Sequence, residues 1–395
     1  MTPPLVPLVE RKSVADSTLP SRASRTDTRI RLLLLSGTSH VGQGVLAAVA
    51  DRRADVEVIA TGSVAGDLAQ VDFDGAYLVP ETATDPRGFA QRLLDIVARE
   101  RPALIIPCRD DDVLALAELR VAHSELPALC GDPEPARTMG DKWLSAKFAA
   151  AQGLPFAPTF VRESGASHAA FVSAIGYPLI AKPRHGASSG GVRLVTNATQ
   201  LEAALASDDC LLQQYLGDPA DVSRFLDDVA ATGLPLFFSF ERRMRSLQAL
   251  IAPDGRVAQV VCTSTIMRHG RSERLQLDPD PRASALGLRC ASAFAAAGWR
   301  GPLNVQCQVT PDGGLAIHEF NGRFTGATAA RRLLGRDEVG PAIEAFTGRR
   351  WSTGPAATAF PAEVVRVPFA LGPDPERLRC IERDGCWRRG ASVRS

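Results

Sequence analysis

One stretch, residues 303–323, limits what this chain can fold into more than any other. It reads LNVQCQVTPDGGLAIHEFNGR, in which two runs of alternating character flank a turn that contains Asp312-Gly313. An Asp-Gly pair between two such runs is a strong short-range signal of a β-hairpin. We therefore predict an antiparallel hairpin in which Thr310 pairs with Leu315.

This pairing fixes the register of the whole hairpin. It brings Gln306 opposite Glu319 and Asn304 opposite Asn321. Side chains of a strand alternate between two faces, so these four polar residues share one face. The other face is predicted to hold His318 among apolar side chains.

The polar face of the hairpin has the chemistry of a cation site. Opposed Cβ atoms lie roughly 4.5–5.5 Å apart in such a pair, so the side-chain oxygens of Gln306, Glu319 and Asn321 can converge on one ion. Mg²⁺ prefers oxygen ligands and is usually held by one or two carboxylates plus substrate phosphates. This predicts a nucleotide-phosphate site. The alternative is a half-exposed hairpin whose outer face is polar and binds nothing.

The composition describes an ordinary globular protein of two or three domains. The 395 residues are 45% hydrophobic and 23% charged, and the net charge is only +1. Such a charge gives no overall field for nucleic acid, so we expect no nucleic-acid partner. The 8 cysteines form no C-x-x-C pair, which argues against a zinc site and against a small disulfide framework.

The N-terminal residues 1–28 are rich in Pro, Ser, Thr and Arg and lack the apolar segment of a signal peptide. We interpret them as a disordered leader. No later apolar run approaches the length of a membrane span. The sequence therefore predicts a cytoplasmic protein without a membrane partner.

Residues 29–130 alternate strand and helix patterns, which favours a small parallel sheet. Strands are expected at 30–36, 56–60, 76–79 and 103–107. The glycines after the first strand, at positions 37, 42 and 44, fit neither the dinucleotide fingerprint nor a Walker A loop. A strand–helix turn that needs small residues is the favoured interpretation. The run Asp110-Asp111-Asp112 is interpreted as a carboxylate-stabilised helix N-terminus rather than a metal site.

A second unit is expected at 131–350, with a smaller lid subdomain at about 155–216. Within it, a strand that ends at Lys182 precedes the loop 184–191, RHGASSGG. Backbone N–H groups of such a loop can approach phosphate oxygens while Lys182 supplies a positive charge. The alternative is a flexible surface turn. Arg268 is a candidate anion clamp or a surface arginine, and residues 351–395 are predicted to form a C-terminal cap segment.

In this order the motifs resemble the ATP-grasp superfamily, most closely the type in the large subunit of carbamoyl-phosphate synthase. The resemblance covers residues 31–338 and includes GYPLIAKPRHGASSGGV, LLQQYLG, GPLNVQCQV and AIHEFNGRFTGA. It implies an α/β and α+β chain. A Rossmann-like parallel-sheet domain would precede a two-subdomain ATP-grasp fold with antiparallel sheets.

The resemblance also implies roles for individual residues. Those implied to bind ATP are Lys142, Lys182, Ser188, Ser189, Gly190, Gly191, Gln214, Tyr215 and Leu216. Those implied to hold Mg²⁺ are Gln306, Glu319 and Asn321, in agreement with the register above. Arg323 would face the transferring phosphoryl group, and Arg268 would hold the substrate acid.

The chain departs from the family pattern at the hinge. An acidic residue is usual there, whereas this chain has Gln213-Gln214, and an insertion follows Gly217. The residue that contacts ribose is therefore open, with Asp218, Asp221 and Glu241 as candidates.

The implied activity is that of an ADP-forming carboxylate–amine ligase, which activates a small carboxylic acid as an acyl phosphate and transfers it to an amine. Its cofactors would be ATP and one or two Mg²⁺ ions, with Mn²⁺ as a substitute, and its partners small molecules. A homodimer would be unsurprising. The alternatives are an ATP-dependent kinase on the same scaffold and a non-catalytic nucleotide-binding regulator.

Overall fold

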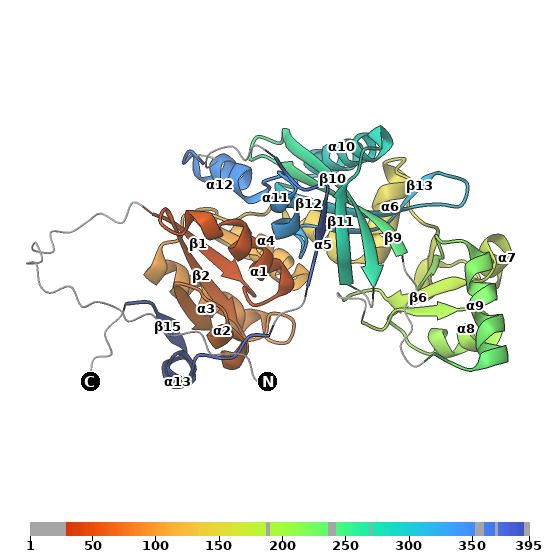
Figure 1. The fold of residues 1–395 in the computed structure, drawn as a ribbon, viewed down its shortest axis with the longest axis horizontal. Coiled ribbons are helices and arrows are strands. Elements are labelled where there is room, and N and C mark those ends of the chain that lie inside the picture. Colours follow the sequence, from red (N-terminus) through yellow and green to blue (C-terminus); the bar gives the residue numbers. More distant parts are fainter. Residues whose placement is uncertain are drawn as a thin grey trace, which may run out of the picture.

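The structure is a computed structural model that describes residues 29–186, 190–235, 242–268, 271–351, 359–367 and 370–390. The expected leader, Ser188 and Ser189 lie outside these ranges, and so does the side chain of Arg268. Within the described residues the strands form a five-stranded, a six-stranded and a four-stranded sheet (Figure 1). The mixture of parallel and antiparallel sheets confirms the predicted fold class.

The first sheet contains four parallel strands from the N-terminal part of the chain. In spatial order they are β3 (Gly75–Leu78), β2 (Val56–Gly62), β1 (Ile30–Leu35) and β4 (Leu104–Pro107). Helices cover the faces of such a sheet, so its strands read as nearly continuous apolar runs. Every residue of β2 and β4 is buried accordingly.

The described part of this unit contains five helical segments, and only some of them begin at a side-chain cap. The five are α1 (His40–Ala48), the short η1 (Ala50–Arg52), α2 (Ala65–Gln70), α3 (Pro86–Glu100) and α4 (Asp110–Ala122). Ser39 caps α1 by accepting a hydrogen bond from the N–H of Gly42 at 3.2 Å. A Cβ at Gly42 would lie 2.2 Å from the carbonyl oxygen of Gly37, so this turn requires glycine for steric reasons.

The second sheet is antiparallel and forms the centre of the molecule (Figure 1). In spatial order its strands are β13 (Leu315–Asn321), β12 (Gly301–Val309), β9 (Arg242–Ile251), β10 (Val257–Arg268), β11 (Arg271–Leu277) and β14 (Glu363–Val365). The helices α5 (Pro133–Gly140), α6 (Lys142–Ala151) and α10 (Pro281–Ala296) pack against it.

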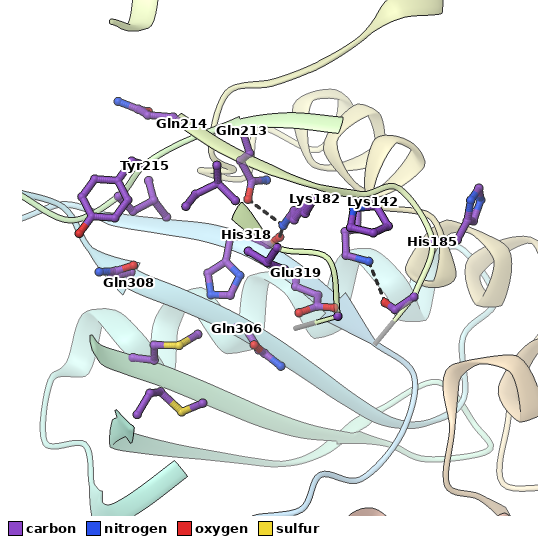
Figure 2. A pocket seen from close by; sticks show the side chains of 18 residues that line it. Lys142, Lys182, His185, Gln213, Gln214, Tyr215, Gln306, Gln308, His318 and Glu319 are labelled. Atoms are coloured by element: carbon purple, nitrogen blue, oxygen red, sulfur yellow. Dashed lines mark hydrogen bonds between the residues drawn. The ribbon is translucent and has the colours of Figure 1, made fainter. Parts of the chain in front are cut away.

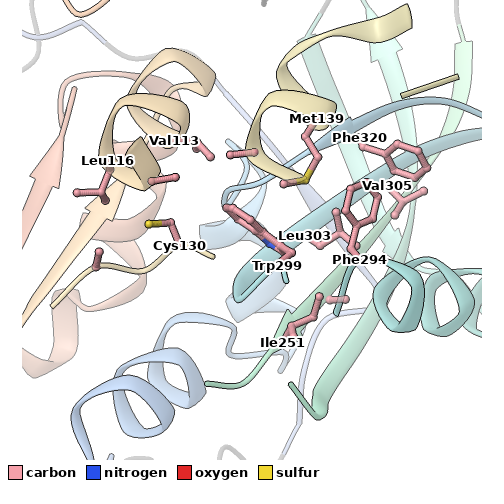
Figure 3. Close-up of a cluster of buried hydrophobic side chains, with 14 of the residues drawn as sticks. Val113, Leu116, Cys130, Met139, Ile251, Phe294, Trp299, Leu303, Val305 and Phe320 are labelled. Atoms are coloured by element: carbon pink, nitrogen blue, oxygen red, sulfur yellow. The ribbon is translucent and has the colours of Figure 1, made fainter. Parts of the chain in front are cut away.

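One hydrophobic cluster joins the first two sheets. It contains the fully buried Trp299, Phe294 and Phe320 beside the central sheet and extends to Val113 and Leu116 of α4 (Figure 3). Burying one such side chain contributes about 1.5–3 kcal/mol. The N-terminal sheet and the central sheet are therefore held together by a shared apolar core.

The third sheet stands apart from the N-terminal sheet (Figure 1). Its strands, in spatial order, are β5 (Thr159–Val161), β8 (Cys210–Gln214), β6 (Leu179–Pro183) and β7 (Arg193–Val195). The helical segments of this part are η2 (Arg162–Ser164), α7 (His168–Ile175), α8 (Ala198–Leu205) and α9 (Pro219–Thr232). The sheet has its own small core around Phe160, Leu179 and Leu212. We call it the lid sheet.

The C-terminal part of the chain adds α11 (Thr328–Leu333), α12 (Val339–Thr347), α13 (Pro375–Asp384) and β15 (Cys386–Arg388). Its two strands join different sheets. β14 pairs with β11 in the central sheet, whereas β15 pairs antiparallel with β3 at the edge of the N-terminal sheet. Among the described residues, the helices lack the length and apolarity that crossing a membrane requires.

Candidate functional site

The hairpin of β12 and β13 has the predicted register at the end away from the turn. Asn304 pairs with Asn321, and Gln306 pairs with Glu319. The structure therefore brings together the opposed polar pairs that alternation of side chains indicates.

Nearer the turn the predicted register is wrong by one residue. Val309, not Thr310, pairs with Leu315, because a register shift lies between Gln306 and Cys307. A β-bulge sets two residues of one strand against one of the other, and here His318 is the extra residue. The turn closes through hydrogen bonds between Thr310 and the two glycines that follow it, Gly313 and Gly314.

The bulge also changes the surroundings of His318. We predicted this residue among the apolar side chains of the opposite face, which is wrong, because His318 and Glu319 line the same cavity. The carbonyl oxygen of His318 accepts a hydrogen bond from Nζ of Lys182 at 3.2 Å. The bulge thus joins the hairpin to the lid sheet.

The cavity lies between the lid sheet and the central sheet, and side chains from both reach into it (Figure 2). Eight of the residues predicted to bind ATP or Mg²⁺ line it, namely Lys142, Lys182, Gly190, Gln214, Tyr215, Leu216, Gln306 and Glu319. Asn321, Gly191 and Arg323 are described but are not part of its wall. The wall also includes Ile180, Met244 and Met267, which give it an apolar part.

Lys182 is the buried cation of the cavity. It lies on β6 with 7% of its surface exposed, and its Nζ donates to Oε1 of Gln213 at 2.9 Å. Gln213 in turn donates from Nε2 to Oγ1 of Thr159 at 3.0 Å, which fixes the orientation of its amide. Two acceptors of Lys182, the amide of Gln213 and the carbonyl of His318, are uncharged. A buried positive charge favours binding of an anion beside it.

Lys142 lines the cavity from the first turn of α6. Its Nζ donates to the carbonyl oxygen of Gly186 at 2.9 Å (Figure 2). The preceding residue, Asp141, caps α6 and pairs with Arg184 at 2.7 Å. Burial opposes ionisation of Asp141, but the Arg184 guanidinium and the N–H groups of Leu144 and Trp143 together outweigh it and hold the pKa of the carboxyl below its ordinary value. The start of α6 is thus tied to the start of the β6–β7 loop.

The chain after β8 forms another side of the cavity. The N–H of Gln214 donates to the carbonyl oxygen of Pro158 at 2.9 Å, and the side chain of Gln214 lies at the edge of the site (Figure 2). Tyr215 lies near Gln308 at one end (Figure 2). Leu216 is buried. The Gln214 amide thus points away from the other labelled side chains of the cavity (Figure 2).

The oxygen donors fit one hard cation better than two. Gln306 and Glu319 line the cavity, whereas Asn321 is buried and its Oδ1 accepts a hydrogen bond from Arg323 at 3.0 Å. No group of three or more His, Cys, Asp or Glu side chains suited to a metal occurs among the described residues. One carboxylate with amide oxygens matches a Mg²⁺ ion that takes its other ligands from phosphates and water.

Arg323 contacts Asp110, a residue that the sequence motifs do not assign to the site. Its Nη2 lies 2.9 Å from Oδ2 of Asp110, in the first turn of α4, and its Nη1 donates to the carbonyl oxygen of Phe324 at 3.1 Å. Burial opposes the charge of Arg323, but the Asp110 carboxylate outweighs it and raises the pKa of the guanidinium. The Asp110–Arg323 pair therefore links the N-terminal sheet unit to the central sheet.

Asp112, two residues further along α4, gives the protein a specific pH dependence. Burial raises its pKa from 3.8 to about 6, and hydrogen bonds from Ser36 and Thr82 only partly oppose this. Between these two pH values the folded chain holds a proton that the unfolded chain releases, so stability falls as the pH rises through this window. The loss is about 3 kcal/mol and is complete above the higher value.

We expect Asp112→Asn to remove this decline, because the variant has no carboxyl to ionise. Thermal unfolding at pH 5, 6 and 7 measures how the stability of each protein changes with pH. Asp111→Asn is the matched control, since Asp111 lies in the same helical turn but is 52% exposed. Parallel curves for the wild type and Asp112→Asn would contradict the assignment.

Comparison with known proteins begins with a negative result, since no family model matches the sequence. A curated relative, the formate-dependent phosphoribosylglycinamide formyltransferase of Bordetella pertussis, is 31% identical over 186 residues, which cover 46% of this chain and 42% of that protein. The chain thus spans less than half the length of the curated relatives it matches.

Two solved structures show the same arrangement over most of the chain. The biotin carboxylase domain of the Hydrogenobacter thermophilus 2-oxoglutarate carboxylase, solved with MgADP, ADP and bicarbonate, has a TM-score of 0.58 at 17% identity and covers 81% of this chain and 70% of that one. The L-amino acid ligase of Bacillus licheniformis has a TM-score of 0.56 at 14% identity and covers 81% of this chain and 74% of that one. With the order of its motifs and the cavity between its two antiparallel sheets, the chain has the ATP-grasp fold.

Proposed function

We propose that this chain is an ATP-dependent ligase that joins a small carboxylic acid to an amine and forms ADP. The observation that carries the proposal is the cavity itself. A buried lysine on the lid sheet, Lys182, and the Gln306–Glu319 pair on the central sheet line one space between the two sheets. A positive charge facing oxygen donors is the arrangement that a metal-bound triphosphate requires.

Different residues of the cavity contact different parts of the nucleotide. Lys142 and Lys182 bind phosphate oxygens, and the β6–β7 loop, including Ser188, Ser189, Gly190 and Gly191, covers them. Gln214, Tyr215 and Leu216 contact adenine through their backbone. The apolar part of the wall, which contains Ile180, Met244 and Met267, packs against the base.

Gln306 and Glu319, with Asn321 behind them, hold Mg²⁺. When bound, this ion neutralises phosphate charge and fixes the geometry of the terminal phosphoryl group. The neighbouring relative solved with MgADP supports the assignment.

The chemistry is the activation of a poor leaving group. A carboxylate oxygen of the acid attacks the γ-phosphorus and the bond to the β-phosphate oxygen breaks, which yields ADP and an acyl phosphate. The amine then attacks the acyl carbon, phosphate leaves with its bridging oxygen, and the amine gives up a proton as the amide forms. Phosphoryl transfer depends mainly on positioning and charge neutralisation, the task of Lys182 and Arg323.

The relatives indicate the size of the acid. The curated relative is named for formate, and one solved neighbour is an L-amino acid ligase. Both names describe small acids. We infer a small carboxylic acid here as well, with Arg268 as its bidentate anchor. A homodimer and a cytoplasmic location belong to the same proposal, and the dimer described for the biotin carboxylase domain supports the former.

Trapping with hydroxylamine tests this function. Purified protein is incubated with MgATP, a pool of small carboxylic acids and hydroxylamine, and the products are analysed by mass. We expect ADP together with one hydroxamate, whose mass identifies the acid, and neither product with Lys182→Ala or Glu319→Ala. ADP with a stable phosphorylated product and no hydroxamate would replace the ligase with a kinase.

A further inference from the structure

The side chain of Arg323 is held from two domains at once. On its own side it contacts Oδ1 of Asn321 at 3.0 Å and the carbonyl oxygen of Phe324 at 3.1 Å. Its Nη2 also donates a hydrogen bond to Oδ2 of Asp110 in the N-terminal sheet unit at 2.9 Å. The two residues are 213 positions apart in the sequence. Among these three acceptors the Asp110 carboxylate is the charged one.

The position of Arg323 makes its orientation important. It lies two residues beyond Asn321 and close enough to Glu319 for that carboxylate to contribute to its electrostatic environment. Glu319 lines the cavity. A long side chain at this point has several rotamers, and the contact with Asp110 selects one of them.

We propose that Asp110 is a positioning residue that holds the guanidinium of Arg323 in the orientation in which it stabilises the transferring phosphoryl group. The inference rests on the proposed function, in which Arg323 faces that group. Asp110 is not among the residues that line the cavity. It acts through Arg323, and it couples the placement of this arginine to the docking of the N-terminal sheet unit.

A purely structural bridge between the domains is the competing explanation, and the packing of the two units disfavours it. The shared apolar core of Trp299, Val113 and Leu116 already joins the two units.

The test uses Asp110→Asn, which removes the charge and keeps the shape. The control is Asp111→Asn, which makes the same charge change in the same helical turn, at a residue whose carboxylate lies 3.7 Å from Arg109. Calorimetry compares the binding of MgADP with the binding of MgADP plus aluminium fluoride, which mimics the transferring phosphoryl group. Asp110→Asn should bind MgADP as the wild type does but the fluoride complex about 10–100-fold more weakly, the range for groups that orient a catalytic partner.

A double-mutant cycle separates positioning from structure. In an Arg323→Ala background, Asp110→Asn should have no further effect on binding of the fluoride complex. Equal weakening of both ligands, an undiminished effect in the Arg323→Ala background, or a similar effect of Asp111→Asn would overturn the inference. If the hydroxylamine experiment shows a kinase instead of a ligase, Asp110→Asn should still weaken binding of the fluoride complex and not of MgADP. The reason is that both enzymes transfer the phosphoryl group. A wild-type chain that binds neither ligand overturns both.

Discussion

Replacing Lys182 with methionine should lower the rate of ADP formation by about 10²–10³-fold, the usual cost of removing one preorganised charge stabiliser. Methionine fills a similar volume, so the packing between the two sheets is kept while the charge is lost. The lysine is only 7% exposed, and burial strengthens its interaction with a phosphate. The measurement is steady-state ADP release at saturating MgATP and acid, with thermal unfolding to verify the fold.

Lys147→Met is the matched control for this experiment. Lys147 is on the same helix as Lys142 but is exposed, with its Nζ 5.8 Å from the ring centre of Trp143. We expect it to leave the rate of ADP formation unchanged. A Lys182→Met enzyme with nearly wild-type turnover would remove this lysine from the proposed phosphate contacts.

Glu319→Gln should raise the Mg²⁺ concentration needed for half-maximal activity by at least about 10–100-fold, the cost of changing groups that merely orient a metal ligand. The reason is that Glu319 is the one carboxylate among the three residues assigned to the ion. Gln306→Glu is the complementary variant, because it places a second carboxylate directly opposite Glu319. This variant should lower the same Mg²⁺ concentration, since the additional negative charge favours the cation.

Activity is measured as a function of free Mg²⁺ at fixed nucleotide concentration. This measurement distinguishes an increase from a decrease in the Mg²⁺ concentration needed for half-maximal activity. Opposite shifts in the two variants would support a single ion between Gln306 and Glu319. If both variants instead keep the wild-type dependence on Mg²⁺, the ion binds elsewhere and the assignment drawn from the hairpin is wrong.

The sequence predicts the hairpin well at one end and poorly at the other, for a physical reason. Alternation of polar and apolar residues specifies which face a strand buries, and that is enough to pair Asn304 with Asn321 and Gln306 with Glu319. A β-bulge adds a residue without changing the composition of the strand, so the pattern carries no sign of it. His318 consequently lines the cavity rather than the opposite face of the hairpin.

Contacts between distant segments are the other part that the sequence leaves open. Gln213 was recognised as a departure from the family hinge, but its hydrogen bond to Lys182 depends on the pairing of β6 with β8. Asp110 was correctly placed at a helix N-terminus, but its contact with Arg323 depends on how two domains pack. Short-range patterns give the elements, whereas the partners of charged side chains follow from tertiary structure.

The most direct measurement follows the oxygen of the acid. Once the hydroxamate has identified the acid, it is supplied with ¹⁸O in its carboxylate, together with MgATP and the amine, and the released phosphate is analysed by mass. An acyl phosphate intermediate predicts one ¹⁸O atom in each phosphate and the loss of that atom from the amide. Phosphate free of ¹⁸O would contradict the central claim that this chain activates a carboxylate by phosphorylation.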